Sequence, residues 1–138
     1  MHEIAPLVVH EHDRPAEGWV TASGGRLTWR TLVSADRDPT RAITAGITEI
    51  PPSDDPVTLH RHAADELYFV VSGAGVVVID GTEHPVHAGS TAFIPGNRWH
   101  AVRNPGPDAL RLFYAFPVDS FSDVVYEFPE GSTPPTWN

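Results

Sequence analysis

The strongest constraint on the fold is a series of short extended segments separated by residues that favour turns. The segments are rich in β-branched and aromatic residues, and many alternate apolar with polar positions, as strands with one buried face do. We expect strands within residues 26–35, 41–50, 57–62, 66–73, 74–86, 90–96, 100–104 and 109–116. Short strands at this spacing predict an all-β fold, a double-sheet barrel of the jelly-roll type.

The chain is expected to form one domain, because 138 residues suffice to bury a single core. We expect an N-terminal arm or edge strand over residues 1–25, with LVVH (7–10) as the strand, and a barrel over residues 26–128. Residues 129–138 are rich in proline and small polar residues, which favours an irregular tail in which Trp137 could dock against a neighbour. Helix is expected only as one turn near residues 119–124.

Composition excludes several classes of protein. The chain has no cysteine, which excludes disulfides, thiolate metal sites and a cysteine nucleophile, and which fits a cytoplasmic protein. A formal net charge of −9 argues against general affinity for nucleic acid or an anionic membrane. No apolar run is long enough to span a membrane, and the N-terminus lacks the pattern of a signal peptide. The expected partner is therefore a small-molecule substrate.

Four side chains form a candidate metal site. His60 and His62 are two residues apart, so in an extended segment both imidazoles leave the backbone on one face. Glu66 begins the next expected strand, and His100 could add a third nitrogen from a later one. Three imidazoles and one carboxylate suit a divalent transition metal, namely Mn, Fe, Co, Ni or Zn, with positions left for substrate or water. The remaining histidines are interpreted as surface or hydrogen-bonded residues.

These segments resemble the cupin family. The first cupin motif, H-x-H, three residues, E, six residues, G, falls on His60, His62, Glu66 and Gly73. The second motif, G, five residues, P, four residues, H, three residues, N, falls on Gly89, Pro95, His100 and Asn104. Asp54 stands where the first motif usually opens with glycine, and the usual second-motif glycine is at Gly96, but neither departure touches a metal position. The resemblance implies a double-stranded β-helix, the jelly-roll cupin barrel, and homodimerisation.

Tyr68 is a candidate base. It lies two residues after Glu66, so in a regular strand its phenol points to the same side as the carboxylate, toward the ion. A nearby divalent cation favours phenolate and lowers the pKa of tyrosine from its ordinary value of about 10. A simpler interpretation is a core ring with a hydrogen-bonded hydroxyl group, which is the more common role of an isolated tyrosine.

A larger part of the chain resembles the small cupin lyases that cleave dimethylsulfoniopropionate into dimethyl sulfide and acrylate. The segments TLHRHAADELY, IPGNRWHAVRN and FYAFPVDSFSDVVYEF carry this resemblance, which spans residues 26–128. It implies that Tyr68 and Tyr126 serve the site, and Trp29 falls on a tryptophan of the family's early strand. A sulfonium would favour an aromatic wall, and the candidates are Trp29, Trp99, Phe113 and Tyr114. For Trp99 and Phe113, plain filling of the barrel is the preferred interpretation.

Other functions remain open. An Fe-dependent dioxygenase would bind oxygen beside its substrate, and a cyclase, dehydratase or isomerase of a secondary metabolite would use the same ligands. A non-enzymatic alternative is a sensor that only binds a small molecule. The candidate tyrosines favour proton transfer over oxygen activation. Arg30, Arg61 and Arg98 could bind a substrate carboxylate, although alternation places Arg61 opposite His60 and His62, on the solvent side.

Overall fold

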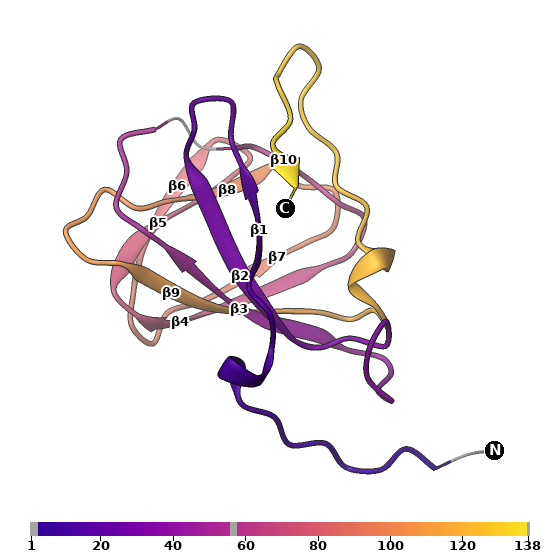
Figure 1. The fold of residues 1–138 in the computed structure, drawn as a ribbon. Coiled ribbons are helices and arrows are strands. Elements are labelled where there is room, and N and C mark those ends of the chain that lie inside the picture. Colours follow the sequence, from indigo (N-terminus) through magenta and orange to yellow (C-terminus); the bar gives the residue numbers. More distant parts are fainter. Residues whose placement is uncertain (1–2, 56–57, 138) are drawn as a thin grey trace.

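The protein is a sandwich of two antiparallel sheets. The computed structural model describes residues 3–55 and 58–137. Figure 1 shows the strands wrapped around one core, with the two short 3-10 helices outside it. The strands are β1 (Glu17–Val20), β2 (Arg26–Val33), β3 (Thr44–Ile50), β4 (Glu66–Ser72), β5 (Ala74–Ile79), β6 (Thr82–His87), β7 (Thr91–Ile94), β8 (His100–Arg103), β9 (Leu110–Phe116) and β10 (Thr136–Trp137), and the 3-10 helices are η1 (Glu11–Asp13) and η2 (Phe121–Asp123).

The larger sheet has the order β10-β1-β2-β3-β9-β4-β7, and the smaller has the order β6-β5-β8. Every pair of neighbouring strands is antiparallel. Consecutive strands pair at β1–β2, β2–β3 and β5–β6, whereas β9 returns to lie between β3 and β4. This confirms the expected all-β fold of the jelly-roll type.

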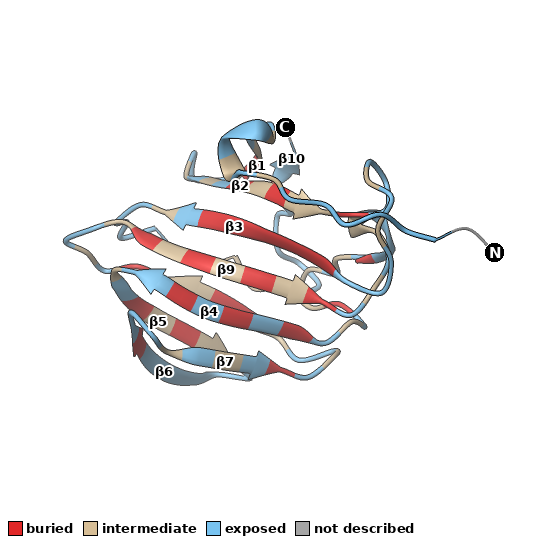
Figure 2. Ribbon diagram, turned by 90° about the horizontal axis from the view of Figure 1, so that it is seen from below, coloured by how far each residue is buried: buried red, intermediate tan, exposed pale blue. Residues whose placement is uncertain are grey.

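Strict alternation along β4 and β9 builds the core. In β9 the buried positions are Leu110, Leu112, Tyr114 and Phe116, and β4 buries Glu66, Tyr68 and Val70. Figure 2 shows buried residues alternating with intermediate ones along β9 and with exposed ones along β4. Because side chains alternate between the faces of a strand, the first residue of β4 directs its carboxylate into the barrel, two positions before Tyr68. The alternation therefore places the carboxylate of Glu66 in an otherwise apolar interior.

Glycine allows two close approaches that shape the interior. Gly73, at φ +84°, links β4 to β5, and a Cβ atom there would lie 2.3 Å from the carbonyl oxygen of Ala109. In β3, a Cβ atom on Gly46 would lie 2.2 Å from the hydroxyl oxygen of Tyr114 and 2.7 Å from the carbonyl oxygen of Arg30. The missing side chain at Gly46 thus makes room for the Tyr114 ring.

Three sequence expectations need correction. Residues 7–10 form no strand, and the strand of the N-terminal region is β1, which pairs with β2. In the segment 57–62, the described residues 58–62 carry only single bridges at His60 and Arg61, and Val57 lies outside the described residues. The tail is not wholly irregular, because β10 pairs with β1 and places Trp137 opposite Trp19. The docking of Trp137 and a helical turn near residues 119–124 are confirmed. Over the described residues, no helix has the length and hydropathy needed to cross a membrane.

The outer face of the larger sheet carries an apolar patch, formed by the exposed side chains of Leu67, Phe69, Val71 and Phe93. Leu67 pairs with Phe93, so the patch is continuous across β4 and β7. The N-terminal arm also exposes apolar residues, including Val8, and extends away from the barrel (Figure 1). Contiguous exposed apolar surface marks interaction sites. Two copies of this chain, related by a two-fold axis, could bury both the patch on the larger sheet and the apolar residues of the N-terminal arm. We propose that two copies associate through this patch.

Changing both Phe69 and Phe93 to glutamate is therefore expected to convert a dimer into a monomer, because charge on the patch cannot be buried without a partner. Light scattering coupled to size exclusion should report two chains of 15.0 kDa for the unmodified protein and one chain for the variant. Val125→Glu, at an exposed apolar residue outside the patch, is the control. An unmodified protein that elutes as one chain would contradict the proposal.

Candidate metal centre

Backbone pairing brings the four predicted metal ligands together. His60 and His100 form an antiparallel bridge with two backbone hydrogen bonds, of 3.1 Å and 2.9 Å. His100 begins β8 in the smaller sheet, and Glu66 begins β4 in the larger one. The bridge places the segment that carries His60 and His62 next to the start of β8. Side chains from three separate segments thus meet at one end of the barrel.

The four side chains are buried and close to one another. One ring nitrogen from each of His60, His62 and His100 lies within 4.8 Å of the others. The Oε1 atom of Glu66 lies 3.2 Å from Nε2 of His62 and 3.2 Å from Nε2 of His100. The four residues are between 1% and 8% exposed. The sequence prediction that these side chains converge is confirmed in this geometry.

Backbone carbonyl groups fix the orientation of each imidazole. The Nδ1 atoms of His60, His62 and His100 lie 2.9, 2.9 and 2.8 Å from the carbonyl oxygens of Thr58, Ala64 and Arg98. A carbonyl oxygen can only accept, so each Nδ1 carries the hydrogen and donates it. The Nε2 lone pairs are then directed to the interior, which is the usual arrangement in histidines that bind a metal.

The pKa values of the ligand side chains depend on one another. Burial, and then the neighbouring His100, lower the pKa of His60 to about 4. Burial also acts to lower the pKa of His62, but the hydrogen bond and the charge of Glu66 outweigh it, so that pKa is raised. Burial acts to raise the pKa of Glu66, and hydrogen bonds from His100 and His62 reverse this and lower it. Glu66 is therefore an anion at neutral pH.

This arrangement requires a positive charge between the side chains. With hydrogen on Nδ1, the Nε2 atoms of neutral His62 and His100 would both turn lone pairs toward the Glu66 carboxylate. A buried anion that faces only lone pairs is costly, so either a proton or a cation must lie between them. The three buried histidines could hold a metal ion, and their nitrogen donors suit a divalent transition metal.

Metal binding is expected to weaken as pH falls. The pKa of His62 is raised by Glu66, so a proton on its Nε2 competes with the ion at a higher pH than it would at an ordinary histidine. His60 stays neutral until about pH 4 and does not compete above that value. A ligand that must lose one proton makes the affinity fall about tenfold per pH unit below its pKa. Titration of metal-free protein with Mn²⁺ between about pH 8 and about pH 5 measures this, and a constant affinity would contradict the assignment.

A cavity of about 350 Å³ opens beside His60 and Glu66, and aromatic side chains form one part of its wall. His60, Glu66, Tyr68 and Tyr126 line it, together with Trp19, Trp29, Tyr114, Phe116 and Phe121. The ring centroid of Tyr126 lies 5.4 Å from that of His60 and 5.3 Å from that of His62. The ring of Tyr68 lies 6.5 Å from that of His100. Both predicted tyrosines therefore reach the ligand cluster, and they approach it from different sides.

Two residues assigned to the substrate pocket lie elsewhere. Phe113 alternates with the buried residues of β9, so its side chain leaves the opposite face of the sheet, where Phe113 pairs with Ile47 and Phe69. Trp99 lies outside the barrel, where the guanidinium carbon of Arg61 is 4.5 Å from the centroid of the Trp99 ring. Trp29 and Tyr114 do line the cavity, as predicted. The preferred interpretation of Trp99 and Phe113, that their rings fill the barrel, is also wrong, because neither side chain lies inside it.

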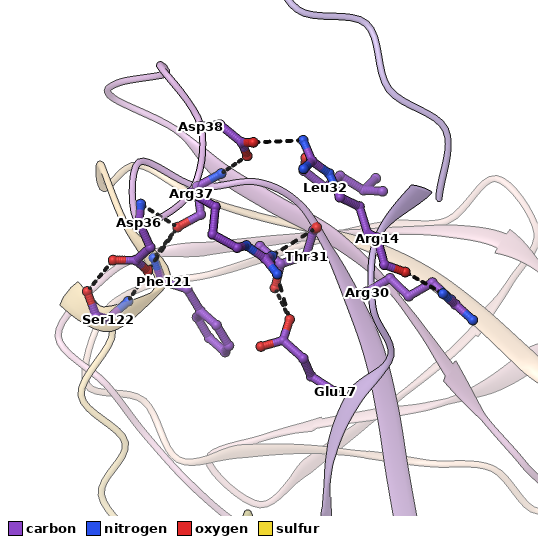
Figure 3. Close-up of polar contacts among 11 residues, drawn as sticks. Arg14, Glu17, Arg30, Thr31, Leu32, Asp36, Arg37, Asp38, Phe121 and Ser122 are labelled. Carbon is purple, nitrogen blue, oxygen red and sulfur yellow. Dashed lines mark hydrogen bonds and ion pairs between the residues drawn. The ribbon is translucent and has the colours of Figure 1, made fainter. Parts of the chain in front are cut away.

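None of the three candidate arginines lines the cavity. Arg61 forms an ion pair with Glu127 at 2.9 Å, which confirms its predicted position on the solvent side. Arg98 pairs with Asp80 at 2.9 Å. Arg30 donates to the carbonyl oxygen of Arg14 on the outside of β2 (Figure 3). The polar mouth of the cavity instead includes Arg26 and Arg103.

Sequence reasoning missed part of the aromatic wall. Trp19 is 4% exposed and its ring lies 5.7 Å from the ring of His60, but the strand of the N-terminal region was predicted at residues 7–10 and not at β1. Phe121 lies in η2 and reaches the cavity from the C-terminal segment. The alternation in Glu17–Val20 is too short to indicate a strand by itself, and only its pairing with β2 and β10 makes it one.

Comparisons with known proteins agree with this geometry. The Cupin domain family matches residues 46–116, which include all four ligand candidates. Dimethylsulfoniopropionate lyase DddW of Ruegeria pomeroyi is 33% identical over 123 residues, which are 89% of this chain and 80% of that protein. The oxalate-binding protein of Thermotoga maritima is 27% identical over 115 residues, 81% of this chain and 94% of that protein.

The fold is also found in a solved structure with a different activity. The polyketide cyclase RemF of Streptomyces resistomycificus superposes with a TM-score of 0.70 and 21% identity, covering 93% of this chain and 89% of that one. At this identity the likeness establishes the fold alone. The match of the Cupin domain model to half of the chain, together with the histidine cluster at the predicted positions, shows that this protein belongs to the cupin family.

Proposed function

We propose that this protein is a metal-dependent lyase. It removes a β-substituent from a small carboxylate substrate such as dimethylsulfoniopropionate, giving dimethyl sulfide and acrylate. The observation that carries the proposal is the placement of Tyr68 and Tyr126 in the cavity that His60 and Glu66 line, next to the cluster that these two residues form with His62 and His100. The lyase of Ruegeria pomeroyi, 33% identical to this chain, supports the choice of reaction. The cavity volume of about 350 Å³ suits a small molecule.

We assign His60, His62, Glu66 and His100 as ligands of a divalent Mn, Fe, Co, Ni or Zn ion. When bound, such an ion acts as a Lewis acid that polarises the substrate carboxylate and makes the adjacent C–H bond more acidic. The carbonyl groups of Thr58, Ala64 and Arg98 keep the imidazoles in the orientation that this requires. The four ligands are between 1% and 8% exposed, and electrostatic interactions are stronger at such buried groups than in water.

Tyr68 is assigned as the base. Burial, and then the negative charge of Glu66, raise the pKa of Tyr68 well above its ordinary value in the metal-free protein. A divalent cation at the ligand cluster opposes this effect, because it favours the anionic phenolate. The phenolate oxygen takes the proton from the carbon next to the carboxylate. The electrons of that C–H bond form the C=C bond, and the C–S bond breaks with its electron pair on sulfur.

This elimination needs no general acid, because a sulfonium leaves as a neutral thioether. Before departure its positive charge is attracted to the faces of aromatic rings, most strongly those of tryptophan. Trp19 and Trp29 are both buried and both line the cavity. Tyr126, on the other side of the ligand cluster, is assigned to orient the substrate carboxylate. The proposal therefore gives Tyr68 and Tyr126 different roles.

The direct test is turnover of dimethylsulfoniopropionate by metal-free protein reloaded separately with Mn, Fe, Co, Ni or Zn. We expect release of dimethyl sulfide, detected by gas chromatography, with at least one of these ions. Absence of release with every ion would contradict the proposal. Oxygen consumption with Fe-loaded protein would instead support a dioxygenase, and thermal stabilisation by a ligand without turnover would support a sensor.

A further inference from the structure

The second cavity tyrosine is not held by a strand. Tyr126 lies between η2 and the single bridge at Glu127, in a segment that crosses the open end of the barrel. Glu127 exchanges two backbone hydrogen bonds with Arg61, of 3.0 Å and 2.8 Å, so the segment is joined directly to the residue between His60 and His62. The ring of Tyr126 is placed mainly by the aromatic residues around it.

The beginning of this segment is anchored by polar contacts that Figure 3 shows. The backbone N–H of Phe121 donates to the hydroxyl oxygen of Ser34 at 2.9 Å, and Ser122 donates through its hydroxyl group to Asp36 at 2.8 Å. These bonds fix η2 against the loop that follows β2. They end four residues before Tyr126, so they do not set the direction of its ring.

Trp137 supplies the missing constraint from the far end of the chain. Strand β10 pairs it with Trp19, and its ring centroid lies 5.1 Å from that of Trp19 and 5.5 Å from that of Trp29. The Trp137 ring also lies 5.3 Å from the ring of Tyr126. Trp137 is 45% exposed, so one side of its ring faces solvent and the other packs against the aromatic wall.

The rings form a layered arrangement. Trp137 is outermost, Tyr126 lies beneath it, and His60 and His62 lie beneath Tyr126. The Tyr126 ring is tilted by 59° to that of Trp137 and by 52° to that of His60, and it meets the His62 ring edge to face at 82°. Close aromatic pairs restrict the relative orientation of rings as well as burying area. Trp19 and Phe121 also contact the Tyr126 ring, at centroid distances of 5.8 and 6.3 Å, but Trp137 is closer, at 5.3 Å. Without Trp137, the Tyr126 ring loses this partner, and the phenol gains room to move away from the ligand cluster.

We propose that Trp137 is a positioning residue: β10 holds its ring against Tyr126 and thereby keeps the Tyr126 phenol over the metal ligands. The catalytic consequence rests on the function proposed above, whereas the effect on the ring of Tyr126 does not. A displacement of about 1 Å in a group that orients substrate can lower the rate by about a hundredfold. Trp137→Ala is therefore expected to lower kcat by at least about tenfold while the bound metal is retained.

The test uses the three tyrosines of the chain, at positions 68, 114 and 126, as probes. Protein labelled with 3-fluorotyrosine should give three ¹⁹F resonances, assigned with the single Tyr→Phe variants. In Trp137→Ala we expect the Tyr126 resonance to shift and to become more accessible to a soluble paramagnetic agent, while the Tyr68 and Tyr114 resonances stay in place. Trp137→Phe, which keeps a ring, should restore most of the Tyr126 signal and most of kcat.

Val125→Ala is the matched control, because Val125 adjoins Tyr126 and is 70% exposed. It should leave the three resonances and kcat unchanged. An unchanged Tyr126 resonance in Trp137→Ala would overturn the proposal, as would equal shifts of all three tyrosines, which would indicate general loosening of the barrel. If the unmodified protein fails to release dimethyl sulfide but Tyr126 responds as described, the lyase function fails and the positioning role stands.

Discussion

Changing Tyr68 to phenylalanine is expected to lower turnover of dimethylsulfoniopropionate by at least about a thousandfold, while the protein retains its fold and its metal. General base catalysis contributes about a hundredfold to ten-thousandfold, and the ring without its hydroxyl group cannot accept the proton. Tyr68 is 6% exposed and packs in the core, so phenylalanine fills the same space without a cavity. Measurement of kcat together with metal content separates loss of the base from loss of the ion.

The other two tyrosines are the comparison for this variant. Tyr114 also lines the cavity but lies over Gly46, directed away from β4, so Tyr114→Phe should cost less than about tenfold in kcat. Tyr126→Phe should raise KM more than Tyr68→Phe does, because Tyr126 is assigned to orient the carboxylate. A Tyr68→Phe variant that retains most of its turnover would reassign the base, and one that loses its metal would place Tyr68 among the ligands.

Changing Glu66 to glutamine is expected to weaken metal binding by at least about a hundredfold. The change removes the one negative charge among the four proposed ligands and keeps the size of the side chain. Changes to partners that only orient ligands cost about tenfold to a hundredfold in affinity, and loss of a ligand should cost more. Titration of metal-free protein with Mn²⁺, followed by the electron paramagnetic resonance signal of the free ion, measures the loss. Glu83→Gln, at an exposed ion pair with Arg103, is the control and should bind as the unmodified protein does.

Glu66→Gln also has a predicted effect on stability in the absence of metal. In that state His62 and His100 approach the carboxylate at 3.2 Å, and the pKa of Glu66 is lowered below its ordinary value by these contacts. A group with a lowered pKa stabilises the folded state above its unfolded pKa and loses that contribution as pH falls through the folded value. That contribution is still fully present above the ordinary Glu66 pKa of 4.5, so His62 decides the slope at higher pH. Glu66 raises the pKa of His62, which then takes up a proton in the folded state, whereas in Glu66→Gln burial alone acts on His62 and lowers its pKa. Metal-free Glu66→Gln should therefore be destabilised by acid more steeply than the unmodified protein. Thermal melts between about pH 7 and about pH 4 test this, and parallel curves would contradict it.

The sequence predicted the parts of the molecule that depend on local pattern. Alternation along β9 and β4 and the turn residues between strands were sufficient for the all-β fold, and the spacing of His60, His62 and Glu66 was sufficient for convergence of these ligands with His100. The parts that were missed depend on pairing between distant segments. β1 and β10 are short and become strands only against each other and β2, so the roles of Trp19 and Trp137 could not be predicted from their neighbours in sequence.

The misplaced pocket residues have a related cause. Phe113 was considered as a pocket residue for its aromatic ring, although the alternation of β9 already placed its neighbours Leu112 and Tyr114 on the inner face. Trp99 precedes β8, where no alternation applies, and its contact with Arg61 joins two loops far apart in sequence. At both positions, the aromatic ring of a residue predicted its location less well than its place relative to the strands did.

The central claim, that His60, His62, Glu66 and His100 bind one divalent ion, is tested most directly by a crystal structure of protein grown with Co²⁺ and measured near the cobalt absorption edge. We predict one strong anomalous peak per chain, bonded to the Nε2 atom of each histidine and to a carboxylate oxygen of Glu66. A peak bonded to other side chains, or four well-ordered side chains with no peak between them, would contradict the claim.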